Sequence, residues 1–245
     1  MQTFGDVIEH LHSEVLRDFA DPPLWSTAAL CEFVAQAHDQ FAEDTLCIRD
    51  ATSAAARVTL RTGVEFYPLS ESVLAVMSAR VDGVEHGLVR AAGPAIDGYV
   101  PSPEVVQWLE RVNYGAPKDD QPLVFATDYS VNGAGAVALR VWPRPSAEFD
   151  GRKVLLRVIR LPAVQCSLDT LEVVPEIPRQ SRMALVHGAA MFAYGSQDAD
   201  GEDGAREAKY RALFNADIER AKVRVARAAF QPVPWGFNHS GFTCS

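Results

Sequence analysis

The sequence lacks the features that direct a chain to or across a membrane. No apolar run approaches the roughly 20 residues that a bilayer-spanning helix needs. The N-terminal stretch MQTFGDVIEHLHSEVL has no basic region followed by an apolar core, which a secretory signal peptide would have. We therefore expect a soluble protein that is not exported through a signal peptide and has no membrane partner.

Residue patterns typical of catalytic, cofactor and metal sites are also missing. The sequence contains no GxSxG, GxxxxGK[ST] or GxGxxG motif, and no two of its six histidines have the HxxxH spacing of a helical metal site. No CxxC pair occurs among the four cysteines, Cys31, Cys47, Cys166 and Cys244, so we expect reduced, mostly buried thiols and neither zinc nor disulfides. These absences predict a protein that is not an enzyme and holds no cofactor or metal.

One acidic stretch, QDADGEDGAREAK at residues 197–209, superficially resembles a calcium-binding loop. Counted from Asp198 against the pattern DxDxDGx(5)E, the positions of the required glycine and of the bidentate glutamate are held by Asp203 and Lys209. The register that starts at Asp200 fails as well. We expect instead that the glycines of this stretch turn the chain between two helices.

The composition is that of an ordinary globular protein, with 48% hydrophobic and 22% charged residues. A chain of 245 residues can bury a sizeable core in one domain or in two closely packed ones. The formal net charge of −9 disfavours a protein that grips DNA by neutralising its phosphates. The same charge suits a surface past which DNA slides without binding.

Two amphipathic helices are predicted at the N-terminus. Apolar residues recur at three- and four-residue steps over Phe4–Phe19, and Thr3 is placed to cap this first helix. The prolines of DPPLW then break the chain, and a second helix begins at Ser26 or Thr27 and runs to about Glu43.

From about Thr45 the apolar period changes to two, which predicts strands. Two hairpins are expected, one that turns at Gly63 and one whose tight turn is Asp82-Gly83. The stretch PSPEVVQWLERV predicts a single helix with Ser102 as its N-cap. Three more strand-like runs follow, PLVFATDYS, AVALRVWPRP and RKVLLRVIRLP, and their interspersed arginines indicate sheets with at least one wetted face.

Helical periodicity returns from about Arg179 to Ser196 and from about Asp203 to Ala229, which predicts a C-terminal helical hairpin. The last stretch, FQPVPWGFNHSGFTCS, supports neither a helix nor a regular strand. Its aromatic residues and stiffening prolines suit it to docking in a partner's groove, where buried aromatic side chains supply much of the binding energy. The residues that we expect to dock are Phe230, Pro232, Pro234, Trp235, Phe237 and Phe242. A tail that folds back on its own domain is the alternative.

Together these elements predict an α+β fold that forms one compact unit, with a helical bundle, a mostly antiparallel β-rich middle region and an extended C-terminal tail. The expected divisions are a helical pair at residues 1–44, a β-rich region with one inserted helix at 45–175, a helical hairpin at 176–229 and the tail at 230–245. No internal repeat or low-complexity segment occurs in the sequence.

Several phrases in this order resemble the head-to-tail adaptor proteins of short-tailed bacteriophages, the neck proteins that connect portal to tail. The phrases cover much of residues 45–229 and are FYPLSESVLAVMSARVDG, ATDYS, ALRVWPRP, LRVIRLP, PEIPRQSRMALVHGAAMFAY, and SQDAD followed by a long helix. None of them is a catalytic signature, so the specificity of the resemblance lies in their combination and order.

The resemblance implies a non-enzymatic virion protein of the neck, made in the host cytoplasm. Such a protein would form a homo-oligomeric ring beneath the portal, by implication a dodecamer, and DNA would pass through the lumen without specific binding. The C-terminal segment would reach up to the portal protein, and the lower face would receive the tail nozzle or tube protein.

Two alternative functions stay open. A nozzle or fibre-attachment component would also be structural but would not form a binary complex with the portal. A hydrolase that uses two carboxylates would need an acidic pair that converges in a pocket, and nothing in the sequence marks such a pair.

Overall fold

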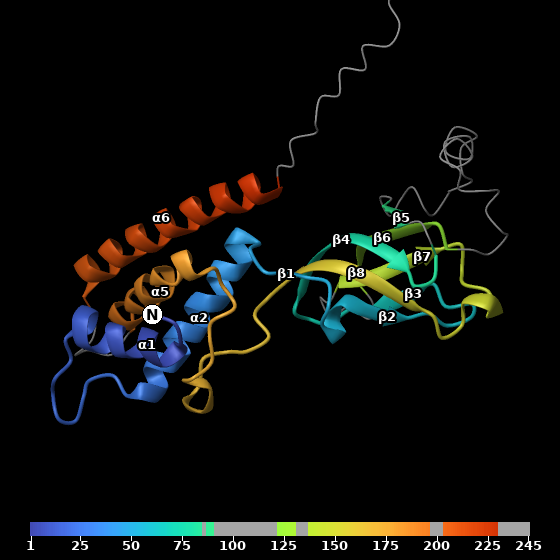
Figure 1. The fold of residues 1–245 in the computed structure, drawn as a ribbon. Coiled ribbons are helices and arrows are strands. Elements are labelled where there is room, and N and C mark those ends of the chain that lie inside the picture. Colours follow the sequence, from blue (N-terminus) through green and yellow to red (C-terminus); the bar gives the residue numbers. More distant parts are fainter. Residues whose placement is uncertain (85–86, 91–121, 131–136, 197–202, 230–245) are drawn as a thin grey trace, which may run out of the picture.

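The described helices and strands occupy separate parts of the molecule (Figure 1). The helical lobe is built from helices near the two ends of the chain, and the strand lobe is built from the described strands between Arg49 and Arg160. The computed structural model describes residues 1–84, 87–90, 122–130, 137–196 and 203–229. The mixed α+β class expected from the sequence is confirmed. The predicted helix at Ser102 lies outside the described residues.

Four of the described helical segments make up most of the helical lobe. They are α1 (Phe4–His10) with a π-helical continuation at Leu11–Leu16, α2 (Thr27–Thr45), α5 (Met183–Tyr194) and α6 (Gly204–Ala229). α5 contacts both α2 and α6, and α6 lies along the outside of the lobe (Figure 1). The bounds lie close to the helical segments expected from the apolar periodicity.

Side chains predicted as helix caps hold the starts of both N-terminal helices. The Thr3 hydroxyl accepts the amide of Asp6, and the Ser26 hydroxyl accepts the amide of Ala29, each at 3.2 Å. Each bond satisfies one of the amides that a first helical turn leaves without a partner. One predicted apolar position is wrong, because the backbone turns left-handed at Arg17 (φ 54°) and leaves Phe19 beyond the helix with 75% of its surface exposed.

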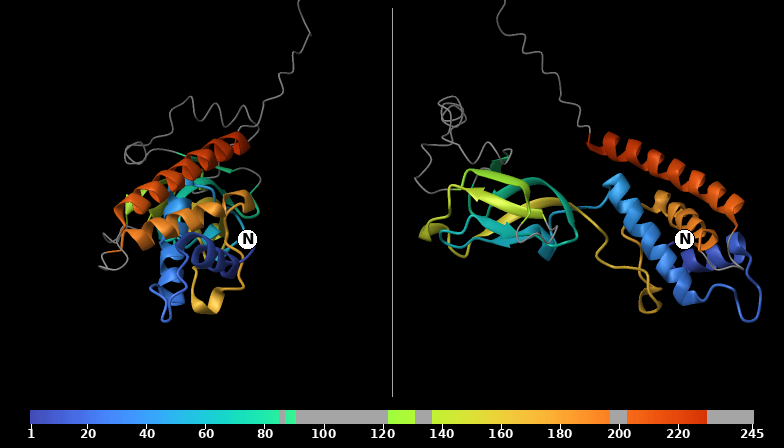
Figure 2. Two further views of the ribbon diagram at one scale, coloured as in Figure 1. Left: turned by 90° about the vertical axis from the view of Figure 1, so that its left-hand side faces the viewer. Right: turned by 180° about the vertical axis from the view of Figure 1, so that it is seen from behind.

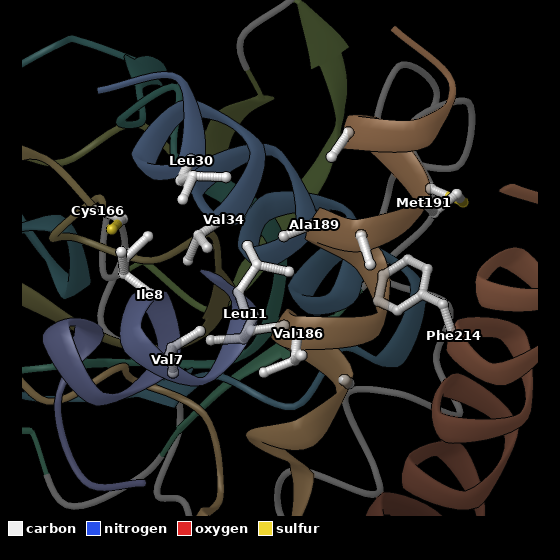
Figure 3. Packing of buried hydrophobic residues seen from close by; sticks show 14 of the residues in the cluster. Val7, Ile8, Leu11, Leu30, Val34, Cys166, Val186, Ala189, Met191 and Phe214 are labelled. Carbon is white, nitrogen blue, oxygen red and sulfur yellow. The ribbon is translucent and has the colours of Figure 1, made fainter. Parts of the chain in front are cut away.

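The helical lobe has an apolar core to which all of these helices contribute. Side chains from the first helix, α2, α5 and α6 lie together in Figure 3, with Cys166 from the segment between β8 and α5. The labelled helical side chains are Val7, Ile8, Leu11, Leu30, Val34, Val186, Ala189, Met191 and Phe214. Small residues make up much of α5, whose sequence is MALVHGAAMFAY. The neighbouring helices can therefore approach its backbone closely.

Gly188 marks the closest of these approaches. A Cβ atom at this position would lie 2.7 Å from the Cβ atom of Ala37 in α2 and 3.0 Å from the ring of Phe214 in α6. Real Cβ atoms do not pack at such distances, so only glycine fits between the two neighbouring helices without displacing them.

The strand lobe is a curled eight-stranded sheet with an apolar core of its own (Figure 2). Its strands are β1 (Arg49–Asp50), β2 (Arg57–Thr59), β3 (Phe66–Pro68), β4 (Val73–Val81), β5 (Gly87–Arg90), β6 (Val124–Ser130), β7 (Val137–Trp142) and β8 (Lys153–Arg160). The order is β1-β8-β4-β5-β6-β7-β3, and β2 also pairs with β8. Among the described strands, β5 and β6 pair in parallel and the other pairs are antiparallel.

Only one of the two predicted hairpins forms. β4 and β5 pair antiparallel after the Asp82-Gly83 turn, where Gly83 takes a positive φ of 76°. The turn at Gly63 instead carries the chain between different partners, because β2 pairs with β8 while β3 pairs with β7. The Gly63 amide donates to the carbonyl of Pro145 at 2.9 Å, which ties this turn to a distant loop and not to a hairpin.

The arginines of the strands do not all mark a wetted face. Arg157 in β8 is exposed as predicted, whereas Arg140 in β7 is only 8% exposed. The guanidinium of Arg140 pairs with the carboxylate of Glu65 and lies over the ring of Phe66 at 5.2 Å. Pairing with a carboxylate offsets the cost of burying this charge.

The contact at Gly188 makes a first prediction. Gly188→Ala should lower the free energy of unfolding by about 1 to 3 kcal/mol, because overpacking between the three helices outweighs the higher helix propensity of alanine. Denaturant unfolding measures the change. Gly204→Ala, where a Cβ atom would meet nothing within 4 Å, is the matched control and should be neutral or slightly stabilising. Equal stability of the two variants would contradict the close approach.

Candidate functional site

The tail residues predicted to dock on a partner, Phe230, Pro232, Pro234, Trp235, Phe237 and Phe242, lie outside the described residues. The same is true of most of the acidic stretch considered for calcium, residues 197–202. Asp203 at its end is described and caps α6, because its carboxylate accepts the amides of Ala205 at 3.1 Å and Arg206 at 3.0 Å. Two exposed surfaces of the helical lobe, one on α6 and one at residues 168–174, lie within the described residues and form the candidate site.

The C-terminal half of α6 carries a groove on its outer surface. Phe214, Ile218 and Ala221 anchor the inner face of the helix in the core. On the outer face, a shallow groove of about 400 Å³ is lined by Glu219, Arg220, Val223, Arg224 and Arg227, which we call the α6 groove. Val223 gives the groove an apolar floor, with 49% of its surface exposed.

Positive charge gathers around this groove although the chain as a whole is acidic. α6 holds seven lysine or arginine residues against three acidic ones, and no acidic residue follows Glu219 within the helix. Arg220 pairs with Asp217 at 2.6 Å, and Arg224 donates to the hydroxyl of Ser181 at 3.2 Å. None of the described carboxylates lies within ion-pair distance of Arg224 or Arg227. Cations near a helix C-terminus also interact favourably with the helix dipole. This interaction does not neutralise the arginines, so the charges of Arg224 and Arg227 are available to a partner.

A second surface is formed by residues 168–174, which we call the 168–174 loop. Its backbone is held on the first turn of α1, since the carbonyl of Leu171 accepts the amide of Gly5 at 2.7 Å and that of Val173 accepts the amide of Phe4 at 2.9 Å. Those two amides would otherwise lack partners. A Cβ atom on Gly5 would lie 3.2 Å from the Leu171 carbonyl oxygen, so glycine lets the loop come this close.

The 168–174 loop displays apolar and acidic side chains together. Leu168 is 58% exposed and Val174 is 49% exposed, while Asp169 and Glu172 between them are also exposed. No lysine or arginine occurs in the sequence between Arg160 and Arg179. The loop is therefore an acidic surface with exposed apolar side chains, held rigidly by backbone hydrogen bonds.

An ion-pair network joins the two lobes at the end of β8. The guanidinium of Arg160 pairs with Asp50 of β1 at 2.7 Å and with Glu176, which precedes α5, at 2.8 Å. The hydrogen bond from Arg160 lowers the pKa of the Glu176 carboxyl from its ordinary value. Glu176 also accepts the amide of Ala163 at 2.8 Å. The chain that leaves the strand lobe is thus fixed where it enters the helical lobe.

The structure brings together two cysteines that are distant in the sequence. The thiols of Cys31 and Cys166 are buried close enough to affect one another's ionisation, and burial raises the pKa of both, so they remain protonated at neutral pH. Among the residues described, no three His, Cys, Asp or Glu side chains are arranged to hold a metal ion. Within the same residues, no helix combines the length and the apolar character that a bilayer crossing requires.

His38 of α2 is an unusual polar group in the core of the helical lobe. Its ring is fully buried, lies edge-on to Phe4 at 5.7 Å, and has no hydrogen-bond partner on either nitrogen among the described residues. Burial lowers the pKa of His38 from its ordinary value of 6.5 to about 4, against the weaker opposing effects of Asp39 and Glu176. The histidine is therefore neutral at physiological pH.

The α6 groove and the 168–174 loop were not found from the sequence. The run without cations from Leu161 to Pro178 and the run without acids from Arg220 to Ala229 are both visible in it. What the sequence does not show is that these segments are exposed beside apolar side chains.

The sequence model of the family described as SU10 adaptor protein matches residues 2–235, which is nearly the whole chain. A search of curated proteins finds no match. The match extends over both lobes and past the end of α6, so it includes both candidate surfaces.

The buried histidine makes a prediction about pH. Between pH 6.5 and pH 4 the unfolded chain binds a proton that the folded protein does not, so stability should fall by about 3 kcal/mol as pH drops through this window. Urea unfolding of the wild type at several pH values measures the loss. His38→Leu, of similar volume, should remove most of this dependence. An unchanged pH profile in the variant would show that His38 does not cause it.

Proposed function

Because the chain belongs to the SU10 adaptor family, we propose that it is a head-to-tail adaptor that assembles as a ring between the portal and the tail of a bacteriophage. The observation that carries this proposal is the length of the family match, which covers both lobes. The protein has a structural role in the virion neck and no enzymatic activity. It is made in the host cytoplasm and assembles with the portal protein above it and the tail nozzle or tube protein below it.

The position of α6 supports a role for the C-terminal tail in portal binding. α6 ends at Ala229, on the outside of the molecule in both Figure 1 and Figure 2. The last side chains of α6 whose exposure is described, Ala226, Arg227 and Ala228, are exposed, and residues 230–245 follow this helix in the sequence. Aromatic side chains that start from such a place can reach a partner without unfolding either lobe.

The charge of the chain supports a passive lumen. A net charge of −9 repels the phosphates of DNA, so a ring of such subunits would let DNA slide through without specific binding. The dodecameric symmetry implied by the resemblance is part of this proposal.

Removal of the tail tests portal binding. A chain that lacks residues 230–245 should keep the melting temperature of the wild type but should no longer bind the portal protein. Trp235→Ala alone should weaken binding about 30-fold, since a buried aromatic anchor is worth about 2 kcal/mol or more. Biolayer interferometry on immobilised portal protein measures both effects. A chain whose tail is replaced by a Gly/Ser sequence of equal length separates the aromatic chemistry from the length.

The outcome also separates the alternatives. Portal binding that survives deletion would disprove docking through the tail, and a wild-type chain that never forms a binary complex with the portal would favour a nozzle or fibre-attachment component instead.

A further inference from the structure

The α6 groove and the 168–174 loop carry opposite charge, and both expose apolar side chains. The groove has an apolar floor at Val223 and the cations Arg220, Arg224 and Arg227 on its rim. The loop offers the exposed apolar side chains of Leu168, Val173 and Val174 next to the carboxylates of Asp169 and Glu172. The two surfaces can therefore pair opposite charges while their apolar side chains contact one another.

The two surfaces lie on opposite sides of the helical lobe. α6 runs along one side, and the segment that contains the 168–174 loop, gold in the figures, lies on the other side in Figure 1 and in both views of Figure 2. The loop of one molecule therefore cannot reach the groove of the same molecule. It can reach the groove of a neighbouring molecule.

We propose that the 168–174 loop of one copy docks on the α6 groove of the next copy and forms the contact between neighbouring subunits. This rests on the proposed ring, because it assigns the surfaces through which the ring closes. Two different patches on opposite sides make a heterologous, head-to-tail contact, which closes into a ring when the rotation between subunits allows it.

The loop is preorganised for this contact. Its backbone is held by the amides of Phe4 and Gly5, and Ser167 and Thr170 form reciprocal hydrogen bonds at its start. A surface that is already ordered loses little conformational entropy on binding.

A second copy fits the groove better than DNA does. DNA phosphates would pair with the arginines but would leave Val223 exposed, whereas Leu168 or Val174 of a neighbour would cover it. The acidic charge of the rest of the chain also opposes DNA binding. Because the contact depends on charge at a solvent-exposed rim, assembly should weaken as salt is raised.

Charge reversal on each surface tests the contact. The groove variant carries Arg224→Glu and Arg227→Glu, and the loop variant carries Asp169→Lys and Glu172→Lys. Either variant alone brings like charges together, so the association constant should fall about 10- to 100-fold. The matched control, Lys209→Glu with Arg211→Glu, makes the same charge change at the other end of α6 and should assemble as the wild type does.

Mixing the two variants gives the sharper result. The acidic wild-type loop of the groove variant can dock on the basic wild-type groove of the loop variant. The basic, reversed loop of the loop variant can dock on the acidic, reversed groove of the groove variant. An equimolar mixture should therefore assemble with alternating subunits. Native mass spectrometry of each protein and of the mixture, alone and with the portal protein, measures the oligomers and their composition. If reversal disturbs the fold, as melting would show, the neutral pairs Arg224→Gln with Arg227→Gln and Asp169→Asn with Glu172→Gln should still weaken assembly.

Each outcome decides the proposal. Rescue on mixing supports it, and variants that assemble as well as the wild type overturn it while leaving the proposed ring intact. A wild-type protein that stays monomeric at every concentration, even with the portal protein, overturns the ring and this contact together. Groove variants that lose binding to a labelled DNA duplex, measured by fluorescence anisotropy, while still assembling would assign the groove to DNA instead.

Discussion

The close approach of α2, α5 and α6 around Gly188 determines where the outer surface of the helical lobe lies. No other residue fits between Ala37 and Phe214 at this point without displacing one of the two neighbouring helices. Phe214, Ile218 and Ala221 of α6 are buried on the side that faces α5 and α2, which fixes the rotation of α6 about its own axis. The rotation in turn directs Val223 and its flanking arginines outward. The position of the proposed contact surface thus follows from packing in the core.

The second surface depends on the N-terminus of α1 and on the junction between the lobes. The amides of Phe4 and Gly5 need acceptors, and the 168–174 loop supplies them, so the start of one helix orders a loop that is distant in the sequence. At the junction, Arg160 holds Asp50 and Glu176 together, which fixes the chain on both sides of the lobe boundary. The Arg49 side chain also donates to the carbonyl of Val225 in α6 at 3.5 Å. Ion pairs and a hydrogen bond therefore link the strand lobe both to the segment that carries the 168–174 loop and to α6.

Local patterns allowed the helices, their caps and the Asp82-Gly83 turn to be predicted, because the residues that decide them are close in the sequence. The turn at Gly63 was misread for the opposite reason. β2 pairs with β8 and β3 pairs with β7. Both partners follow much later in the chain, so the residues around Gly63 do not predict these pairings. The same limit applies to the candidate site. The charge of the α6 groove and of the 168–174 loop is visible in the sequence, but their exposure and their placement on opposite sides depend on the tertiary fold.

A zero-length carbodiimide cross-linking experiment on assembled protein tests the central claim most directly. Lys222 lies beside the α6 groove and is exposed, so its amine can couple to the carboxyl group of Asp169 or Glu172 in a neighbouring copy. Rings assembled from an equal mixture of unlabelled and ¹⁵N-labelled protein show which cross-links join different copies. The account predicts a mixed-isotope peptide that links Lys222 to Asp169 or Glu172. Assembled rings whose mixed-isotope cross-links join other surfaces, with none between α6 and the 168–174 loop, would contradict it.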